Sequence, residues 1–131
     1  MIRSRNGFLL AELATGVFLI AALMAVTTSI IFACSDHVRA AHGFFVARQI
    51  TSNHLETMKA LPFDDLRFTS ADGEDFTSPL STQLKDFAGK VRVEQFNANP
   101  GLKRITVTVR WNEKRRTREV SLSVLRGKRT P

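Results

Sequence analysis

Residues 7–35 read GFLLAELATGVFLIAALMAVTTSIIFACS, and a single charged side chain, Glu12, interrupts them. From Leu13 to Ser35 the sequence carries no charge over 23 residues. An α-helix rises about 1.5 Å per residue, so this run reaches roughly 35 Å, whereas the hydrocarbon core of a bilayer is about 30 Å thick. The stretch therefore predicts a helix that crosses a membrane.

The helical pattern continues beyond the apolar segment and becomes amphipathic. Apolar residues recur at steps of three and four over residues 38–61, with polar residues between them. No proline occurs between Phe8 and Leu61, and Pro62 disfavours helical backbone at the residue before it. We therefore expect one helix from Phe8 to Leu61, with a bend at Gly43.

The last third of the chain shows the alternation of β-strands. Apolar and polar residues alternate in Arg104–Trp111 and in Glu119–Leu125, and the polar segment Asn112–Arg116 between them is typical of a hairpin. Residues 91–96 alternate in the same way, and Asn97–Gly101 is a predicted turn. We expect three or four antiparallel strands whose apolar face covers the amphipathic half of the helix.

These elements predict an α+β fold in four parts. Residues 62–79 are rich in turn-forming residues and predict a loop, and Ser81 is predicted to cap a short helical turn over residues 81–88. The four parts are a basic leader peptide, a membrane-spanning half of the helix, an amphipathic half, and a head of loop and antiparallel sheet. They cover residues 1–7, 8–35, 36–61 and 62–131.

Positive charge is concentrated near the C-terminus. The chain has a formal net charge of +7, and residues 102–131 contain ten Lys or Arg against two Glu, which makes this segment +8. Such a segment indicates either a solvated basic hairpin or an acidic partner: nucleic acid, anionic lipid or an acidic protein face. We expect Arg126–Pro131 to be a frayed tail. The candidate residues for an acidic partner are Arg110, Lys114, Arg115, Arg116 and Arg118.

Catalytic and metal-binding patterns do not stand out. No nucleophile, base and orienting acid occur together, and no glycine-rich phosphate loop follows a strand, so we expect no enzyme and no cofactor. His37 and His42 lie about 140° apart on a helix, and with His54 they do not form a predicted ligand set. An acidic loop has the composition of a calcium loop but lacks the EF-hand spacing. Its carboxylates are Asp64, Asp65, Asp72, Glu74 and Asp75.

Glu12 is the one charged side chain in the apolar segment, where a membrane-spanning helix would not be expected to carry a charge. A carboxylate at the centre of a membrane helix costs about 2.5–3.5 kcal/mol, and less near an end, so such a residue indicates a functional site. The nearest cations, Arg3 and Arg5, lie outside the membrane. If the chain is cut after Gly7, Phe8 gains an α-amine four residues before Glu12. That amine can pair with Glu12 in the same chain or in a neighbouring helix.

The sequence at these positions resembles the prepilin signature of type IV pilins and of the pseudopilins of type II secretion. The resemblance rests on the motif G-F-x-L-x-E-L, which begins at Gly7, on the basic leader that Arg3 and Arg5 supply, and on the uncharged span. It implies that a prepilin peptidase cuts after Gly7 on the cytoplasmic side and methylates Phe8. It also implies that Glu12 complements the N-terminus of an adjacent subunit.

The resemblance further implies a structural subunit, and a minor pilin or minor pseudopilin is favoured. Leu9 and Ala11 depart from the usual residues of the family, the helix lacks the proline common in its membrane half, and no C-terminal cysteine pair is present. The implied partners are the prepilin peptidase, other pilins or pseudopilins, and the inner membrane. The implied topology is a cytoplasmic N-terminus with the head in the periplasm or outside the cell, and Arg3 and Arg5 favour the same orientation.

Two alternative interpretations of the N-terminal segment stay open. Residues Ile31–Cys34 have the form of a lipobox, which predicts a lipoprotein, and an uncleaved signal anchor is the other alternative. Either would be an envelope protein whose basic domain binds DNA or another acidic partner. Against the lipoprotein, and against an ordinary cleaved signal peptide as a further option, the apolar segment is longer than the 7–15 residues typical of such signals, and Glu12 lies inside it.

Overall fold

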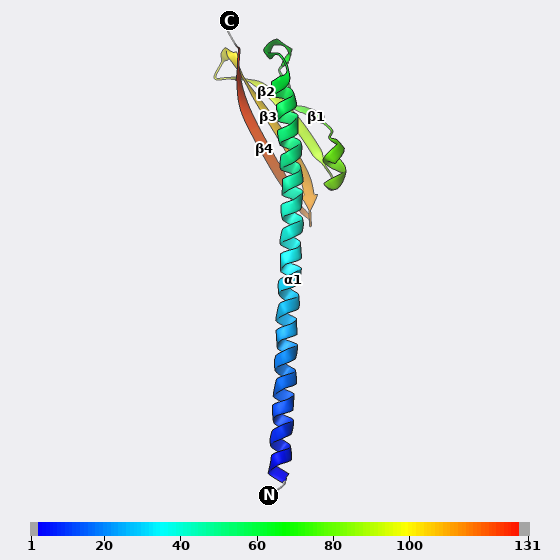
Figure 1. The fold of residues 1–131 in the computed structure, drawn as a ribbon. Helices are drawn as coiled ribbons and strands as arrows, with labels where there is room; N and C mark the ends of the chain where they lie inside the picture. The colour runs from blue at the N-terminus through cyan, green and yellow to red at the C-terminus, as the bar shows by residue number, and fades with distance from the viewer. Residues whose placement is uncertain (1–2, 129–131) are drawn as a thin grey trace. The chain divides into compact units, whose positions relative to one another are not determined.

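The protein was analysed as a computed structural model that describes the backbone of residues 3–128 and the side chains of residues 7–128. It divides into two compact units, residues 1–39 and 40–131. The first unit consists of the N-terminal part of helix α1 (Arg3–Ala60), and the second contains the rest of α1 and a four-stranded antiparallel sheet (Figure 1). The predicted α+β fold is confirmed, and α1 ends within one residue of the predicted position.

Most of the described hydroxyl groups in the first unit bond to the backbone of their own helix. Four hydroxyls each donate to the carbonyl four residues earlier at 2.8–2.9 Å, those of Thr15, Thr27, Thr28 and Ser29. This pattern needs no water, so these side chains are compatible with a lipid environment. The described residues contain one candidate membrane span, near the N-terminus, and its most apolar window is not buried by the protein.

The sheet belongs to the second unit and has the order β1-β2-β3-β4, with each neighbouring pair antiparallel. Its strands are β1 (Glu74–Phe76), β2 (Ala88–Phe96), β3 (Asn99–Glu113) and β4 (Arg116–Gly127). Strand β1 falls in the segment predicted as a loop. It has three residues, too few to show alternation, and it exists because Glu74 and Phe76 pair with β2 at the sheet edge.

Both long hairpins turn in two residues. Asn97–Ala98 connects β2 to β3, and Lys114–Arg115 connects β3 to β4. All four residues have positive φ, at 50°, 54°, 43° and 66°, as in type I′ turns. The predicted five-residue turns are too long, because Phe96 pairs with Asn99 and Glu113 pairs with Arg116 directly beside the turns; in β2–β3 the register then shifts between Phe96 and Gln95.

The helical turn predicted over residues 81–88 is instead a 3-10 helix over Pro79–Gln83. Ser78 caps it rather than Ser81, since the Ser78 hydroxyl accepts a hydrogen bond from the N–H of Leu80 at 3.3 Å. Proline suits the first helical position because its missing N–H would be unpaired there in any case. The Ser-Pro pair therefore starts the turn earlier than predicted.

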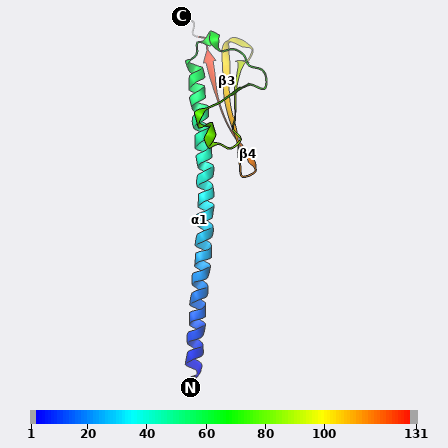
Figure 2. The same ribbon diagram turned by 90° about the vertical axis from the view of Figure 1, so that its right-hand side faces the viewer.

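The core forms where the apolar face of the sheet packs on the second half of α1 (Figure 2). Three helix residues meet three sheet residues in one buried cluster: Val46, Ala47 and Ile50 with Val109, Trp111 and Val120. A second cluster lies under the loop that follows α1 and consists of Leu66, Val91, Val93, Ile105 and Val107. The predicted inward face of the strand Arg104–Trp111 is confirmed.

Gly43 is the point of α1 that approaches the sheet at the β3–β4 end. The helix continues through Gly43 without a break, although the sequence predicts a bend there. A Cβ on Gly43 would lie 3.3 Å from Nε1 of Trp111, and the Trp111 ring meets the ring of Phe44 edge-on with centroids 6.2 Å apart. Glycine therefore leaves room for the indole against the helix.

The opposite end of the sheet is joined to the end of α1. The guanidinium of Arg126 donates to the carbonyls of Lys59 and Leu61, which belong to the helix end where carbonyls lack helical partners. The N–H of Lys128 donates to the carbonyl of Gly101 at 2.8 Å. The frayed tail predicted from Arg126 onward is therefore wrong up to Lys128, and residues 129–131 lie outside the described part of the chain.

Lys103 is a buried cation that ties the loop after α1 to the sheet. Its side chain is 8% exposed, and Nζ donates to the carbonyls of Phe63 and Leu66 at 2.8 and 2.7 Å. The rings of Phe63 and Phe68 lie 4.3 and 5.1 Å from Nζ, at cation–π distance. Lys103 thus satisfies two loop carbonyls that the sheet does not reach.

We expect Lys103→Met to lower the free energy of unfolding by about 1–3 kcal/mol, because it leaves buried carbonyls without a donor. The measurement is urea denaturation of the full chain in detergent, followed by the fluorescence of Trp111, the only tryptophan. Lys90→Met is the matched control, since Lys90 is half-exposed and its ion pair with Asp75 is long, at 3.9 Å. The control should change stability by less than about 0.5 kcal/mol. Equal effects of the two substitutions would contradict the role of Lys103.

His54 packs face to face on Phe76 of β1, with ring centroids 3.9 Å apart and an interplanar angle of 10°. This contact half-buries the imidazole between α1 and the sheet edge. Loss of solvation lowers the pKa of His54 below its ordinary value of 6.5. The folded protein therefore favours neutral His54, and the unfolded chain binds the proton more readily.

Stability is consequently expected to fall as the pH drops below 6.5, because the unfolded state then takes up a proton that folded His54 resists. Above pH 6.5 the contribution is fully present. His54→Gln cannot titrate, so this part of the pH dependence should disappear in the variant. Urea denaturation of both proteins between pH 7.5 and about 5 measures the two slopes. Identical slopes would show that another group is responsible.

Candidate functional site around Glu12

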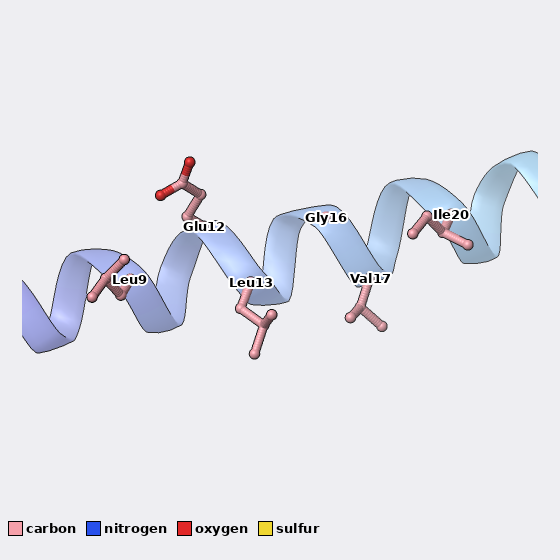
Figure 3. A pocket seen from close by; sticks show the side chains of 6 residues that line it. All are labelled: Leu9, Glu12, Leu13, Gly16, Val17 and Ile20. Carbon is pink, nitrogen blue, oxygen red and sulfur yellow. The ribbon is translucent and has the colours of Figure 1, made fainter.

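Glu12 lies on the exposed surface of α1 in the first unit, and its carboxylate points away from the helix (Figure 3). No side chain among residues 7–128 forms a hydrogen bond or an ion pair with it. The apolar side chains around Glu12, among them Leu9 and Leu13, are also exposed. The site therefore presents one bare negative charge on an apolar surface.

A shallow groove adjoins Glu12 at Gly16 (Figure 3). Gly16 follows Glu12 by four residues and so lies on the same face of the helix. Apart from the adjoining residues and the backbone of its own helical turn, no atom lies within 4 Å of a Cβ built on Gly16, so this position is open to the approach of another helix. Gly16 is not among the predicted site residues, although its spacing from Glu12 indicates a shared face. The groove is lined by Leu9, Glu12, Leu13, Gly16, Val17 and Ile20.

The predicted cleavage position lies four to five residues before Glu12. Gly7 and Phe8 are both in the helical backbone of α1, and the Phe8 side chain is 73% exposed. Phe8, Glu12 and Gly16 follow one another at steps of four, so they form one row along the helix. The side chains of Arg3 and Arg5, predicted to form the basic leader, lie outside the described residues.

The predicted basic site is at the β3–β4 hairpin of the second unit, and part of its charge is paired. Arg110 donates to Glu119 through Nε and Nη2 at 3.0 and 2.7 Å, and Arg118 donates to Glu113 at 3.3 Å. The two contacts link the strands on opposite faces of the sheet: Arg110 and Glu119 lie on the solvent-exposed face, whereas Arg118 is opposite buried Trp111. Exposed ion pairs of this kind contribute little to stability, with a median of about 0–1 kcal/mol.

The remaining basic residues of the predicted site lie at the tip of the hairpin. Lys114 and Arg115 form the turn itself and Arg116 opens β4, and all three side chains are exposed. Arg115 and Arg116 form no ion pair within the described part of the chain. The structure therefore places Arg110 and Arg118 in ion pairs between the strands, whereas Arg115 and Arg116 are exposed at the tip without an ion pair among the described residues.

The acidic loop and the histidines do not form a common site. Asp64 pairs with Lys128 at 3.5 Å, Asp75 lies near Lys90, and His54 is stacked on a ring as described above. Across residues 3–128 no three His, Cys, Asp or Glu side chains gather where they could hold a metal ion. Cys34 is a free, exposed cysteine near the end of the apolar segment.

Comparison with known proteins gives no relative. No family model, curated protein or solved structure matches the chain. Its function is therefore argued from Glu12, from the groove at Gly16 and from the basic hairpin.

Proposed function

We propose that this protein is a structural subunit of a type IV pilus or of a type II secretion pseudopilus, of the minor pilin kind. A prepilin peptidase removes residues 1–7 and methylates the new N-terminus at Phe8. Residues 8–35 anchor the subunit in the inner membrane and then pack against the helices of other pilins or pseudopilins. The N-terminus faces the cytoplasm, and the head lies in the periplasm or outside the cell.

The observation that carries this proposal is the carboxylate of Glu12, which has no partner among residues 7–128, beside the open backbone of Gly16. Burying a carboxylate in a membrane costs free energy unless a cation offsets it. The amine of a cut chain is such a cation, and a like helix shifted along its axis by four residues, about 6 Å, brings its amine level with Glu12. Because Gly16 adds no side chain to this face, the neighbouring helix can come close enough for the pair to form.

The first test is the N-terminus of the mature protein. We expect mass spectrometry of the chain from peptidase-competent cells to find N-methylated Phe8 as the first residue. Gly7→Ile is the control, because a branched side chain before the cut should block cleavage and leave residues 1–7 attached. A wild-type chain that keeps its leader would contradict the proposal and favour a signal anchor. A chain that begins at Cys34 would identify a lipoprotein.

The second test concerns Glu12. We expect Glu12→Ala to insert normally but to lower the share of subunit in sheared filaments by about tenfold, which corresponds to about 1.4 kcal/mol of lost helix pairing. Carbonate extraction measures insertion, and immunoblotting of the filament fraction measures assembly. Glu56→Ala is the matched control: Glu56 lies on the sheet-bearing part of α1 and pairs with Lys59 at 2.8 Å. Equal incorporation of the two variants would remove Glu12 from assembly.

A further inference from the structure

Strand β4 forms one edge of the sheet, on the side away from β1 (Figure 1). In a two-residue hairpin the residues that flank the turn, here Glu113 and Arg116, form a hydrogen-bonded pair, and such pairs alternate along antiparallel strands. The N–H of Lys128 donates to the carbonyl of Gly101, which confirms that even-numbered residues face β3. The outward backbone groups are those of Thr117, Glu119, Ser121, Ser123 and Leu125.

This outer edge of β4 is open. None of its outward N–H and C=O groups has a partner in the part of the chain that the structure describes. Natural proteins protect such edges with a proline, a bulge or a covering segment. Strand β4 contains no proline, and it pairs with β3 along its whole length without a register shift. An edge of this kind can bind another extended chain through main-chain hydrogen bonds.

The opposite edge of the same sheet is closed. Strand β1 pairs with the first half of β2, and Thr69 covers the next position. The N–H of Thr69 donates to the carbonyl of Val93 at 3.1 Å, and the Thr69 hydroxyl accepts from the N–H of Val93 at 3.0 Å. A register shift between Gln95 and Phe96 then interrupts the pairing of β2 with β3. The chain therefore covers one edge of its sheet and leaves the other available.

The apolar face of the sheet extends beyond the cover that α1 provides. On β3, Ile105, Val107 and Val109 are fully buried. Leu122 and Val124 lie opposite two of these residues on the same face of β4, but they are only partly buried. A strand added beside β4 would place its own side chains next to them. Apolar residues are therefore favoured at those positions of a partner strand.

The charge along β4 indicates what else the partner strand carries. Residues 120–125 are uncharged. Toward the turn, Arg116 forms no ion pair in the described part of the chain, and Arg118 is half-exposed with donors beyond its one contact. At the other end of the strand, Arg126 and Lys128 already contact carbonyls of α1 and a carboxylate. The charge open to a partner therefore lies at the turn end and calls for acidic residues.

We propose that the outer edge of β4 binds an extended segment of a partner protein, which joins the sheet antiparallel to β4. The segment is apolar opposite Val120, Leu122 and Val124 and acidic opposite Arg118 and Arg116. Because the strands are antiparallel, the arrangement with the more stable pairing, the acidic residues lie at the C-terminal end of the segment. This contact requires neither cleavage of the chain nor filament assembly, so it goes beyond the proposed function.

The test uses the full chain in detergent micelles and two capped, fluorophore-labelled peptides. The acidic peptide is Val-Thr-Val-Thr-Val-Thr-Glu-Thr-Glu, whose residues lie in turn opposite Val124 to Arg116. The control peptide has lysine in place of both glutamates. We expect fluorescence anisotropy to show about tenfold tighter binding of the acidic peptide at low salt. The difference should shrink at high salt, because exposed charge pairs are screened.

The direction of the bound peptide can be read from Trp111, the only tryptophan, which lies opposite Arg118. A nitroxide at the C-terminal end of the acidic peptide should quench Trp111 more than a nitroxide at the N-terminal end. The reverse order would show a parallel strand and would overturn the proposed placement of the acidic residues.

Ser121→Pro tests the backbone contact. The N–H of Ser121 points away from β3, so proline should leave the sheet intact while it removes a donor to the added strand. We expect about tenfold weaker binding of the acidic peptide, with an unchanged circular dichroism spectrum. Ser121→Ala is the matched control, because it removes the hydroxyl that contacts Thr108 at 3.0 Å but keeps the N–H. It should bind like the wild type.

Arg116→Gln tests the charge and decides the matter if the proline variant does not fold. Loss of one exposed ion pair should weaken binding of the acidic peptide about two- to fivefold. Arg67→Gln is the control, since it removes the same charge from an exposed residue of the loop after α1. This control should bind like the wild type.

Three results would overturn the proposal. They are no binding of the acidic peptide, equal binding of the two peptides, and unchanged binding by folded Ser121→Pro. If the wild type instead forms dimers in sedimentation experiments that Ser121→Pro abolishes, a second copy of the chain occupies the edge and not a partner segment. None of these results bears on the N-terminus of the mature protein or on Glu12, so they are distinct from failure of the proposed function.

Discussion

Burial of one apolar sheet face against the second half of α1 organises the head of this protein. A sheet with a single apolar face needs a cover, and α1 supplies it through Val46, Ala47 and Ile50. The absence of a side chain at Gly43 lets the large ring of Trp111 join this interface. The interface fixes which end of the sheet carries the basic hairpin, so the position of charge on the head follows from the packing of its core.

Polar groups find hydrogen-bond partners in different ways in the two units, and Glu12 is the exception. In the head, buried Thr51 donates to the carbonyl of Ala47 at 2.7 Å, and Lys103 and Arg126 serve carbonyls that secondary structure leaves open. In the apolar segment the hydroxyl groups of Thr15, Thr27, Thr28 and Ser29 bond to their own helix. Glu12 has no hydrogen-bond or ion-pair partner among residues 7–128. Its partner therefore has to come from water, from the N-terminus or from another molecule.

The elements that the sequence predicts well are those with a strong local period. The alternation over residues 104–111 predicts both strand and buried face, and the spacing in α1 with Pro62 predicts the helix and its end. Strand β1 was missed because it is defined by its partner β2 and not by its own three residues. The burial of Lys103 was likewise missed, because it depends on the carbonyls of a loop forty residues away. At the candidate site, the sequence motif indicates Glu12 directly. Gly16 is identified only in the structure, where it lines the groove beside Glu12.

The geometry around Glu12 also bears on which amine would neutralise it if the chain is cut after Gly7, as proposed. The amine of the same chain, at Phe8, lies one turn away on the same face, and pairing with it would need no neighbour. Such a pair does not involve Gly16, because Phe8 lies one turn before Glu12 and Gly16 lies one turn after it. Pairing with a neighbouring helix would involve both residues. The backbone at Gly16 allows the two helices to approach closely, and the charge of Glu12 fixes the register between them. The glycine next to the carboxylate is thus the physical reason to favour pairing between subunits over pairing within one.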